Sequence, residues 1–553
     1  MSYIAKIKNL DNREVAFEEN DSLESILKKV EKDLPYPIYV AKLDNAYRAL
    51  THLCTHDCTI EFLDLRNSQA WLVYQNSLTL LFIKCVHDIL GPKVLVTVKN
   101  SLNKGLYITL NHHLEEEEVR KIEDHMHEIV EKDLPIVKEH YNKYEAIRLA
   151  KSLKQEETVR LLESITNIDD IEIYSLEDEV QIFYNLVVPS CGYLKLFALK
   201  QFKNGVILRY PHPQDPNVIA EYVDQKQMYD AFSEANRWGK LMGVNFAVDL
   251  NESIISGRIE DLFLLQEALH EKRISDIADM IKEKGSRVVL ICGPSSSGKT
   301  TFAKRLCIQL GVNGFKTLYI GTDDYYKELH ERVYDEDGEP DLESIRAIDT
   351  DLFQNNLIDL LEGREADLPH YNFNTNKKEF GKRIVKLEKN QLIVIEGIHG
   401  LNRQLTERVD DAQKFKIYIS PLTPVAIDHH NRLSTTDVRM LRRMVRDYKF
   451  RNRSAEGTIA AWPKVRAGED TNIFPFNSEA DVFFNSNCIY EIAVIKKYAE
   501  PLLKRIRRNQ DEYAEAQRML SFLKYFDFIY DESDIVNNSI IREFIGGSVI
   551  VKN

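Results

Sequence analysis

The sequence has no uninterrupted apolar run of the roughly 18 residues that a membrane-spanning helix needs. Its most apolar stretch, LTLLFIKCVHDIL, is interrupted by Lys84, His87 and Asp88. Cysteine is also scarce, and seven cysteines, an odd number, do not indicate a disulfide framework in 553 residues. The first residues, MSYIAKIKNLDNREV, lack the charged head and apolar block of a secretion signal. We therefore expect a cytoplasmic protein with no membrane segment.

The chain also lacks net positive charge, because 87 acidic residues outnumber 73 basic ones and give a formal charge of −14. Such a balance argues against a surface built throughout for nucleic acid. Residues 432–466 have the opposite charge balance, with ten Lys or Arg against three acids. We expect this basic segment to meet an anionic ligand. A nucleic-acid contact through the front half and a homo-oligomer are left open.

Periodicity divides the chain into four parts. Residues 1–63 alternate strand patterns with one helical pattern, which predicts a small sheet packed on one helix. Residues 64–230 mix helices, such as 77–89, with strands such as VQIFYNLVV, and residues 231–284 form a mainly helical connector. From 285 to 553, the apolar runs RVVLIC, KTLYIG, QLIVIEG, KFKIYIS and ADVFFN alternate with helical segments. This part is predicted to be an α/β domain, a parallel sheet with helices on both faces.

A phosphate-binding loop follows the first of these runs. The segment GPSSSGKT fits G-x-x-x-x-G-K-S/T between a strand and a helix. Its amides and the helix N-terminus suit a triphosphate, Lys299 would bridge the β- and γ-phosphates, and the Thr300 hydroxyl would bind Mg²⁺. A serine-rich turn is the alternative, and a GTPase is disfavoured because the sequence has no Asn-Lys-x-Asp element. The predicted ATP-binding residues here are Gly293, Ser295, Ser296, Ser297, Gly298, Lys299, Thr300 and Thr301.

Acidic residues follow the next two strands. LYIGTDDYYKE places Asp323 and Asp324 at the carboxyl end of a parallel strand, which we expect beside the phosphate loop. Asp323 is the predicted base that accepts the proton of an attacking hydroxyl, and capping of the following segment is the alternative for either acid. QLIVIEG ends with Glu396, which we expect to hold Mg²⁺ together with Thr300, unless it only caps a loop.

The basic segment contains the helical pattern DVRMLRRMVRDYKFRNR. Arg439, Arg443 and Arg446 fall on one stripe, with Arg451 and Arg453 beyond it. Arginines stabilise the negative charge of a transferring phosphoryl group, so we expect a mobile lid that closes over ATP. An ordinary solvated helix face is the alternative.

Taken together, GPSSSGKTT, TDDYY, LPHYNF, VIEG and LRRMVRDYKFRNR resemble the uridine kinase and phosphoribulokinase family of P-loop kinases, over residues 286–553. The resemblance implies a nucleoside kinase with Asp323, Lys299 and Arg446 as catalytic residues and with Arg442 and Arg443 on ATP. An Asn stands where uridine kinases usually carry a His that reads the pyrimidine edge, so the base is left open. The implied substrate-binding residues are Tyr326, Asp341, Tyr371, Phe373, Asn376, Arg451 and Arg453.

The front half carries a second resemblance. Residues 1–63 resemble the β-grasp TGS domain of threonyl-tRNA synthetases, and residues 64–230 resemble the adjoining α+β editing domain. Asn76 and Leu80 replace both histidines of the editing H-x-x-x-H pair, and no matching C-x-x-x-H lies near Cys191. The resemblance therefore implies a binding, regulatory or assembly module in place of a hydrolase.

Four residues of zinc-ligand type alternate along one short stretch: His52, Cys54, His56 and Cys58. In an extended strand such residues lie roughly 6 to 7 Å apart along one face, too far to converge on one tetrahedral ion. A turn would be needed to bring them together, so a metal site here is left open.

Three functions are compatible with the sequence. The first is Mg²⁺- and ATP-dependent phosphorylation of a nucleoside at the ribose 5′-hydroxyl. The second is the phosphorylation of another hydroxylated metabolite by the same machinery. The third is an RNA- or ribosome-associated ATP-binding regulator whose front half binds RNA, against which the acidic net charge argues.

Overall fold

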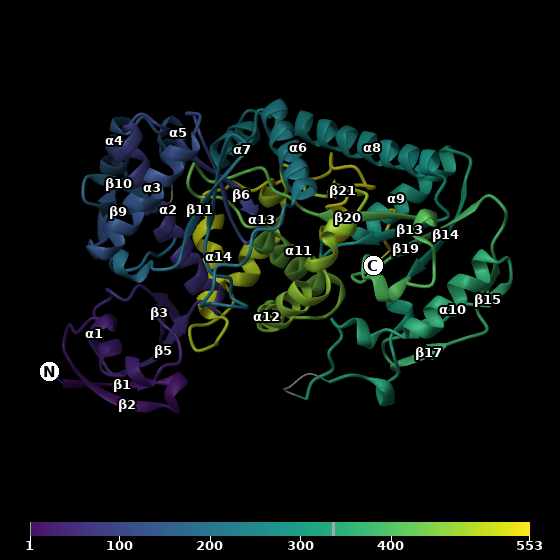
Figure 1. The fold of residues 1–553 in the computed structure, drawn as a ribbon, viewed down its shortest axis with the longest axis horizontal. Coiled ribbons are helices and arrows are strands. Elements are labelled where there is room, and N and C mark those ends of the chain that lie inside the picture. Colours follow the sequence, from purple (N-terminus) through teal and green to yellow (C-terminus); the bar gives the residue numbers. More distant parts are fainter. Residues whose placement is uncertain (1, 167, 335–337, 553) are drawn as a thin grey trace.

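The computed structural model describes residues 2–166, 168–334 and 338–552. Figure 1 shows the two N-terminal regions, in purple and blue, at one end of the molecule and a parallel sheet toward the other. The yellow-green helices α13 (Glu491–Leu503) and α14 (Tyr513–Leu523) lie between them. None of the helices in the described ranges combines the length and apolarity of a membrane span.

The first region is a five-stranded mixed sheet in the order β2-β1-β5-β3-β4, and helix α1 shares its apolar core. β1 and β2 form an antiparallel hairpin, whose turn places Asp11 and Asn12 in the left-handed conformation that these residue types tolerate. The small sheet on one helix is therefore observed. The elements are β1 (Ser2–Ile7), β2 (Arg13–Glu18), α1 (Leu23–Lys28), β3 (Ile38–Leu43), β4 (Ala46–Arg48) and β5 (Cys58–Asp64).

The second region contains a four-stranded sheet, β11-β12-β7-β6, and a three-stranded sheet, β10-β9-β8. Its central helix begins at Ser68, nine residues before the predicted start, because the Asn67 side chain caps it. The strand predicted over VQIFYNLVV ends at Ile182, because the next amides bond elsewhere: Val188 N donates to Ser77 Oγ at 2.9 Å. The elements are α2 (Ser68–Leu90), β6 (Val96–Leu102), β7 (Gly105–Leu110), α3 (Glu116–Glu131), β8 (Val137–Asn142), α4 (Lys143–Ser152), α5 (Glu156–Ser164), β9 (Asp170–Leu176), β10 (Glu179–Ile182), β11 (Ala198–Phe202) and β12 (Gly205–Arg209).

The connector is helical, and the third region is the predicted α/β domain. Its five parallel strands follow the order β14-β19-β13-β20-β21. Side chains of β13 alternate between two cores, with Val289 and Ile291 in one and Val288 and Leu290 in the other, so both faces are covered. The elements are α6 (Lys226–Met242), α7 (Ala247–Ile255), α8 (Ile259–Lys284), β13 (Val288–Cys292), α9 (Lys299–Val312), β14 (Lys316–Gly321), α10 (Thr350–Leu361), β15 (Glu365–Asp367), β16 (His370–Asn372), β17 (Lys377–Glu379), β18 (Ile384–Lys386), β19 (Gln391–Glu396), β20 (Lys414–Ser420), α11 (Thr435–Phe450), α12 (Ala455–Asn472), β21 (Val482–Asn485), α13, α14 and α15 (Arg542–Ile545).

The strand order corrects one sequence-based expectation. The strand that leads to Asp323 was expected directly beside the phosphate loop, yet β19 lies between β14 and β13. The reason is that β19 hydrogen-bonds to both strands, a pairing that local sequence patterns do not encode. Glu396 at the end of β19 consequently occupies the middle position at this sheet edge.

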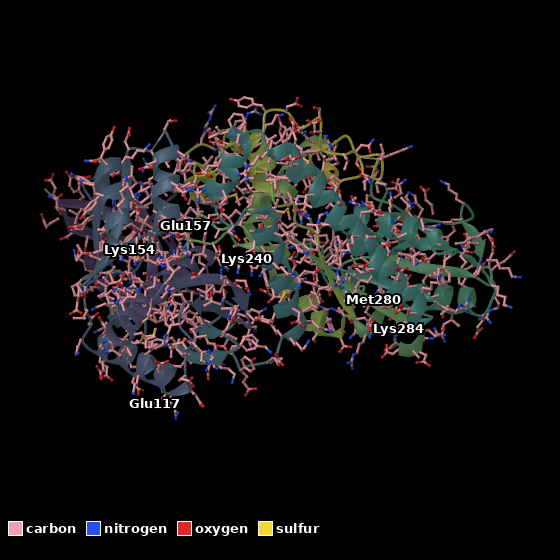
Figure 2. All side chains as sticks on the ribbon, turned by 90° about the horizontal axis from the view of Figure 1, so that it is seen from above. Glu117, Lys154, Glu157, Lys240, Met280 and Lys284 are labelled. Carbon is pink, nitrogen blue, oxygen red and sulfur yellow. The ribbon has the colours of Figure 1, made fainter. Side chains whose placement is uncertain are left out.

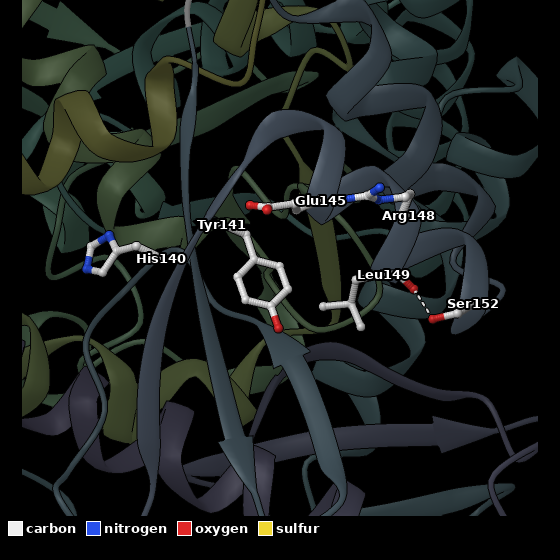
Figure 3. A pocket seen from close by; sticks show the side chains of 6 residues that line it. All are labelled: His140, Tyr141, Glu145, Arg148, Leu149 and Ser152. Carbon is white, nitrogen blue, oxygen red and sulfur yellow. Dashed lines mark hydrogen bonds between the residues drawn. The ribbon is translucent and has the colours of Figure 1, made fainter.

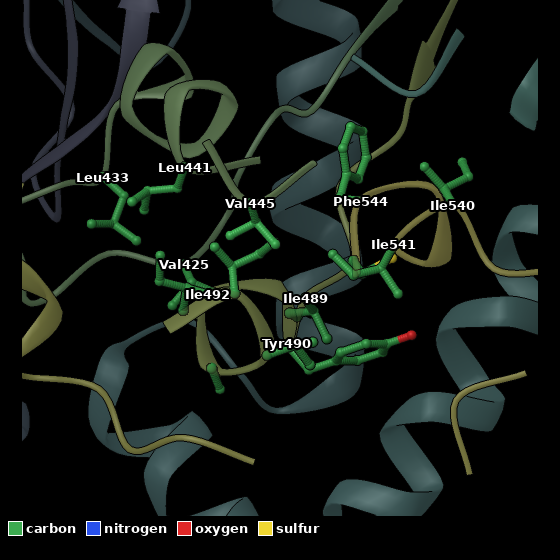
Figure 4. Packing of buried hydrophobic residues seen from close by; sticks show 14 of the residues in the cluster. Val425, Leu433, Leu441, Val445, Ile489, Tyr490, Ile492, Ile540, Ile541 and Phe544 are labelled. Atoms are coloured by element: carbon green, nitrogen blue, oxygen red, sulfur yellow. The ribbon is translucent and has the colours of Figure 1, made fainter. Parts of the chain in front are cut away.

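The end of the chain completes the core of the third region. Figure 4 shows Ile541 and Phe544 packed near Val445 of α11 and Tyr490 at the start of α13. All four side chains are buried. The C-terminal segment is thus part of the domain's folding unit.

The second region holds the loop that precedes α11. His429 is the centre of this contact: its carbonyl accepts from Val98 N at 2.9 Å, and its Nδ1 lies 3.0 Å from Thr97 Oγ1. Its Nε2 lies 3.3 Å from Glu157 Oε2, a residue labelled in Figure 2. Arg432 also donates to Ser101 Oγ. The N-terminal half therefore positions the entrance to the arginine-rich helix.

Candidate active site

The phosphate loop joins β13 to α9, as predicted. Ser296 and Gly298 have φ angles of 60° and 84°, and these left-handed turns direct successive amides inward. A Cβ at Gly293 would lie 2.2 Å from the Ile419 carbonyl oxygen, so β20 can approach only a glycine. Lys299 Nζ donates to the Pro294 carbonyl oxygen at 3.2 Å, which keeps the ammonium group within the loop.

Two arginines of α11 support the loop from the protein interior. Arg439 pairs with Glu469 and donates to the Ser295 carbonyl oxygen at 3.2 Å, and Arg442 pairs with Glu491 at 2.6 Å. Their exposed fractions are only 1% and 0%. This differs from the expected mobile lid, because buried glutamates hold both guanidinium groups beneath the loop. Arg442, predicted to contact ATP, is instead fully buried and donates to the carbonyl oxygens of Ser296 and Ser486.

The next arginines along α11 share one carboxylate. Asp447 lies 3.3 Å from Arg443, 2.8 Å from Arg446 and 3.7 Å from Arg451. Arg443 also donates to Ser295 Oγ at 2.9 Å. Asp323 acts on Arg451 and Glu343 on Arg443, while Lys299 adds a fourth cation to the group. Four cations outnumber three acids, so positive charge remains for an anion at this place. Arg453 donates instead to a carbonyl oxygen of α12, that of Gly457, at 3.1 Å.

The two predicted Mg²⁺ residues come together. Thr300 Oγ1 donates to Glu396 Oε2 at 3.3 Å, and Tyr319 OH donates to the same oxygen at 2.9 Å. Burial raises the pKa of Glu396, and the nearby Lys299 ammonium opposes this shift. A hydroxyl and a carboxylate are the hard oxygen donors that suit Mg²⁺ beside phosphates. Sequence reasoning missed Tyr319, which lies inside a strand run and carries no motif.

Asp323 lies among cationic side chains. It is solvent-accessible, yet the protein around it dehydrates the carboxyl group and raises its pKa. Lys299, Arg451 and Arg446 oppose the shift. The predicted base, the loop lysine and two predicted arginines thus share one electrostatic environment.

Asp324 has a different role. Its Oδ1 lies 3.0 Å from His370 Nδ1 and accepts from Tyr371 N at 3.4 Å. These bonds tie the turn after β14 to β16. These contacts are not the cap of the following segment that the sequence left open as the alternative, because His370 and Tyr371 lie more than 40 residues farther along the chain.

Glu343 is an acidic residue that the sequence analysis did not select. Burial raises its pKa to about 7, while Arg443 opposes the shift and Asp323 adds to it. The predicted ribose-binding acid, Asp341, lies two residues earlier, in a loop where its amide donates to the Val333 carbonyl oxygen at 2.9 Å. Spacing alone does not distinguish these two acids, and in the structure the charges of Arg443, Lys299 and Asp323 act on Glu343.

Three aromatic residues gather near this acid. The ring of Tyr371 lies 5.9 Å from that of Tyr326 and 5.0 Å from that of Phe373, in edge-to-face arrangements. Tyr371 is buried, whereas 60% of Phe373 is exposed. Arg332, another residue without a motif, donates to Tyr371 OH at 2.8 Å and to the Asn376 side-chain oxygen. The predicted base-binding residues are therefore linked in one cluster.

A second group of potential metal ligands lies away from the phosphate loop. One ligand atom each from Glu267, His270 and Cys488 comes within 4.8 Å of the others. Arg305 donates to Glu267 at 3.1 Å, and Gln266 Nε2 lies 3.0 Å from His270 Nε2. Internal partners already occupy the carboxylate and one ring nitrogen, Nε2, whereas the buried Nδ1 of His270 has no hydrogen-bond partner among the described residues.

The alternating His and Cys residues of the first region are separated. Cys54 and Cys58 are buried in the apolar core of the first region. His56 is exposed, with Nε2 3.3 Å from Asp44, and His52 is exposed as well. In the part of the chain that the structure describes, the four residues form no common metal-binding group.

Comparisons with known proteins match the part of the chain that carries the phosphate loop, Asp323, Glu396 and the arginines of α11. Residues 288–493 match the model of the Phosphoribulokinase / Uridine kinase family. Uridine kinases of Staphylococcus aureus strains JH9 and Newman are 27% identical over 212 residues, which are 38% of this chain and 93% of theirs. These matches support a kinase that uses ATP and a small hydroxyl-bearing substrate.

Two solved structures align with parts of the chain. A possible uridine kinase from Bacillus stearothermophilus is 23% identical, with a TM-score of 0.26, and the alignment covers 38% of this chain and 98% of that one. A D-glycerate 3-kinase from Cryptococcus neoformans is 14% identical, with a TM-score of 0.20, over 49% of this chain and 87% of that one.

Proposed function

We propose that the third region phosphorylates a nucleoside at the ribose 5′-hydroxyl, with ATP as the phosphoryl donor. The observation that carries the proposal is the position of Asp323, which follows β14 at the sheet edge of the phosphate loop, where the charges of Lys299, Arg446 and Arg451 oppose the rise of its pKa. A base next to cations is what phosphoryl transfer to an alcohol requires. The similarity to uridine kinases supports the choice of a nucleoside.

Separate groups of residues bind ATP, hold Mg²⁺, accept the proton and stabilise the transferred phosphoryl group. Loop amides and Lys299 bind the triphosphate, and Thr300 with Glu396 would hold Mg²⁺, which neutralises charge on the β- and γ-phosphates. Asp323 takes the proton of the 5′-hydroxyl as that oxygen attacks the γ-phosphorus. Arg443, Arg446 and Arg451 stabilise the negative charge that the transfer spreads over the phosphoryl oxygens.

Acceptor recognition is assigned to the remaining side chains. The rings of Tyr326, Tyr371 and Phe373 offer an edge and a face to a nucleobase. Glu343, next to Asp323, would accept hydrogen bonds from ribose hydroxyls when it is ionised. Asn376 can donate and accept hydrogen bonds at a base edge.

An acceptor panel tests the proposal. Purified full-length protein with Mg²⁺ and ATP is offered uridine, cytidine, adenosine and guanosine, and separately sugar phosphates and pantothenate. ADP release that rises with a nucleoside, and formation of the 5′-monophosphate, would support the proposal. Stimulation by a sugar phosphate alone would retain the kinase and reject the nucleoside.

A further inference from the structure

A cavity of about 350 Å³ lies where five separated segments of the chain meet, among them α2 with Gln69 and β9 with Asp170 and Glu172. β4 contributes Tyr47 and Arg48, the segment after β10 contributes Tyr184, and the C-terminal segment around α14 contributes Arg508 and Lys524. This volume is in the range of small-molecule sites. The cavity is separate from the phosphate loop, and the kinase reaction proposed above does not use it.

The charges that line the cavity are unevenly balanced. Its acids have partners, because Glu172 accepts from Lys138 at 2.6 Å and Asp170 lies 3.0 Å from His140. Figure 3 shows His140 and Tyr141 projecting from opposite sides of β8. Both residues also line a second, shallow depression. The cavity's Arg518 is likewise neutralised by two carboxylates.

Three cations at the cavity have no such partner. Within residues 2–166, 168–334 and 338–552, Arg48, Arg508 and Lys524 form no ion pair, although Glu172 and Asp170 of the lining act on Lys524 from a longer distance and oppose the lowering of its pKa by burial. Arg48 donates to the neighbouring Tyr47 carbonyl oxygen at 2.9 Å, and Arg508 makes a long contact of 3.4 Å with the Asp44 carbonyl oxygen. Guanidinium and ammonium groups without carboxylates suit a phosphate group.

Aromatic side chains form the other part of the lining. The rings of Tyr184 and Tyr525 lie 4.1 Å apart, and Tyr47, Tyr513 and Phe183 also border the cavity. Flat aromatic surfaces bind planar ring systems through stacking and edge contacts. A ligand with both a planar ring and a phosphate would use both parts of the lining.

We propose that this cavity binds a nucleotide, with its phosphate on Arg48, Arg508 and Lys524 and its base among the tyrosines. Occupancy can be transmitted to the kinase site, because Arg518 in the cavity wall donates to Asp437 Oδ2 at 3.1 Å, in the first turn of α11. Tyr184 N also donates to Asn431 Oδ1 at 3.3 Å, in the loop before that helix. This transmission to catalysis rests on the proposed kinase function, whereas the binding does not.

Binding to the full-length protein tests the site. UMP, CMP, AMP and GMP are titrated by calorimetry into wild type, the double variant Arg508→Gln/Lys524→Gln and Lys299→Ala. At least one nucleotide should bind to a site that survives Lys299→Ala and that the double variant weakens at least about tenfold. Gln517→Trp, which fills the cavity from an exposed position, should weaken the same site. Lys389→Gln, an exposed lysine far from the lining in sequence, is the matched control and should change nothing.

Titrations with other ligands show which part of the lining contributes to binding. Orthophosphate alone and uridine alone should each bind at least about tenfold more weakly than the best nucleotide, because each uses half of the lining. Equal binding of orthophosphate, or binding of an RNA oligonucleotide but of no free nucleotide, would overturn the proposal. So would unchanged affinities in both cavity variants. A failed acceptor panel would reject the kinase function and leave this binding result intact.

Discussion

The first and third regions each contain a five-stranded sheet, yet they use the ends of their strands differently. In the mixed sheet, neighbouring strands point both ways, and its charged residues pair at the surface, as Lys6 of β1 does with Glu14 of β2. In the parallel sheet, β13, β14 and β19 end at the same edge, which brings the phosphate loop, Asp323 and Glu396 together. Parallel topology thus collects residues from distant segments into one site.

The largest expected effect tests whether this sheet edge performs catalysis. Asp323→Asn should lower kcat by about 10³-fold, because an amide cannot take the hydroxyl proton, while the Kd for ATP changes little. Asp324→Asn is the matched control and should lower kcat by less than about tenfold, because Asp324 supports β16. Steady-state kinetics and ATP titration of both variants provide the measurement. Equal losses in both would remove the distinction between the two acids.

A second comparison is between arginines beneath and beside the phosphate loop. Arg442→Met should lower the free energy of unfolding by about 3 to 5 kcal/mol, because it leaves Glu491 buried without its partner. Arg443→Met should cost less stability than Arg442→Met, because Asp447 keeps Arg446 and Arg451 as partners, and it should lower kcat instead. Urea denaturation and kinetics of the two variants check this. A stability loss of the same size in both would contradict the assignment.

A third prediction concerns pH. Burial raises the pKa of Glu343 to about 7 from an ordinary value of 4.5, so the folded protein binds this proton more tightly than the unfolded chain. Glu343 therefore lowers the free energy of unfolding progressively as pH rises from about 4.5 to 7, and the full penalty remains above that range. Glu343→Gln should remove the penalty, gaining roughly 1 to 3 kcal/mol over wild type at pH 8 but not at pH 4.

The same variant has a kinetic consequence. If ionised Glu343 binds the acceptor, wild-type kcat/KM should rise through pH 7, and Glu343→Gln should lose that step together with about tenfold in kcat/KM. Asp341→Asn is the control and should keep the step. A step that persists in Glu343→Gln would assign it to another group.

The smallest expected effect is in the first region. The double variant His52→Ala/His56→Ala should change the free energy of unfolding by less than about 0.5 kcal/mol, because both side chains are exposed. The zinc content of the purified protein should also stay the same, which elemental analysis measures. A loss of bound zinc would restore the metal site that the alternating His and Cys residues suggested.

Local sequence was sufficient for the features that depend on nearby residues. The apolar runs predicted all five strands of the parallel sheet, and the spacing from Gly293 to Thr300 predicted the phosphate loop, because its turn geometry depends on consecutive residues. The positions of Asp323 just after one of these strands and of Glu396 at the end of another were also predicted. The first residue of α2 and the last residue of β10 were not predicted. The Asn67 cap determines where α2 begins, and hydrogen bonds to distant groups determine where β10 ends.

Tertiary structure alone decided how these pieces are arranged. The place of β19 between β14 and β13 depends on hydrogen bonds between strands some 70 to 100 residues apart in the chain. The selection of Glu343 over Asp341, and the burial of Arg442 against Glu491, depend in the same way on which distant groups come near. Short-range patterns determine which helices and strands form and which residues have side chains suited to binding or catalysis. Long-range packing determines which of those residues come into contact, because a side chain's partners come from segments that its own neighbours in sequence do not specify.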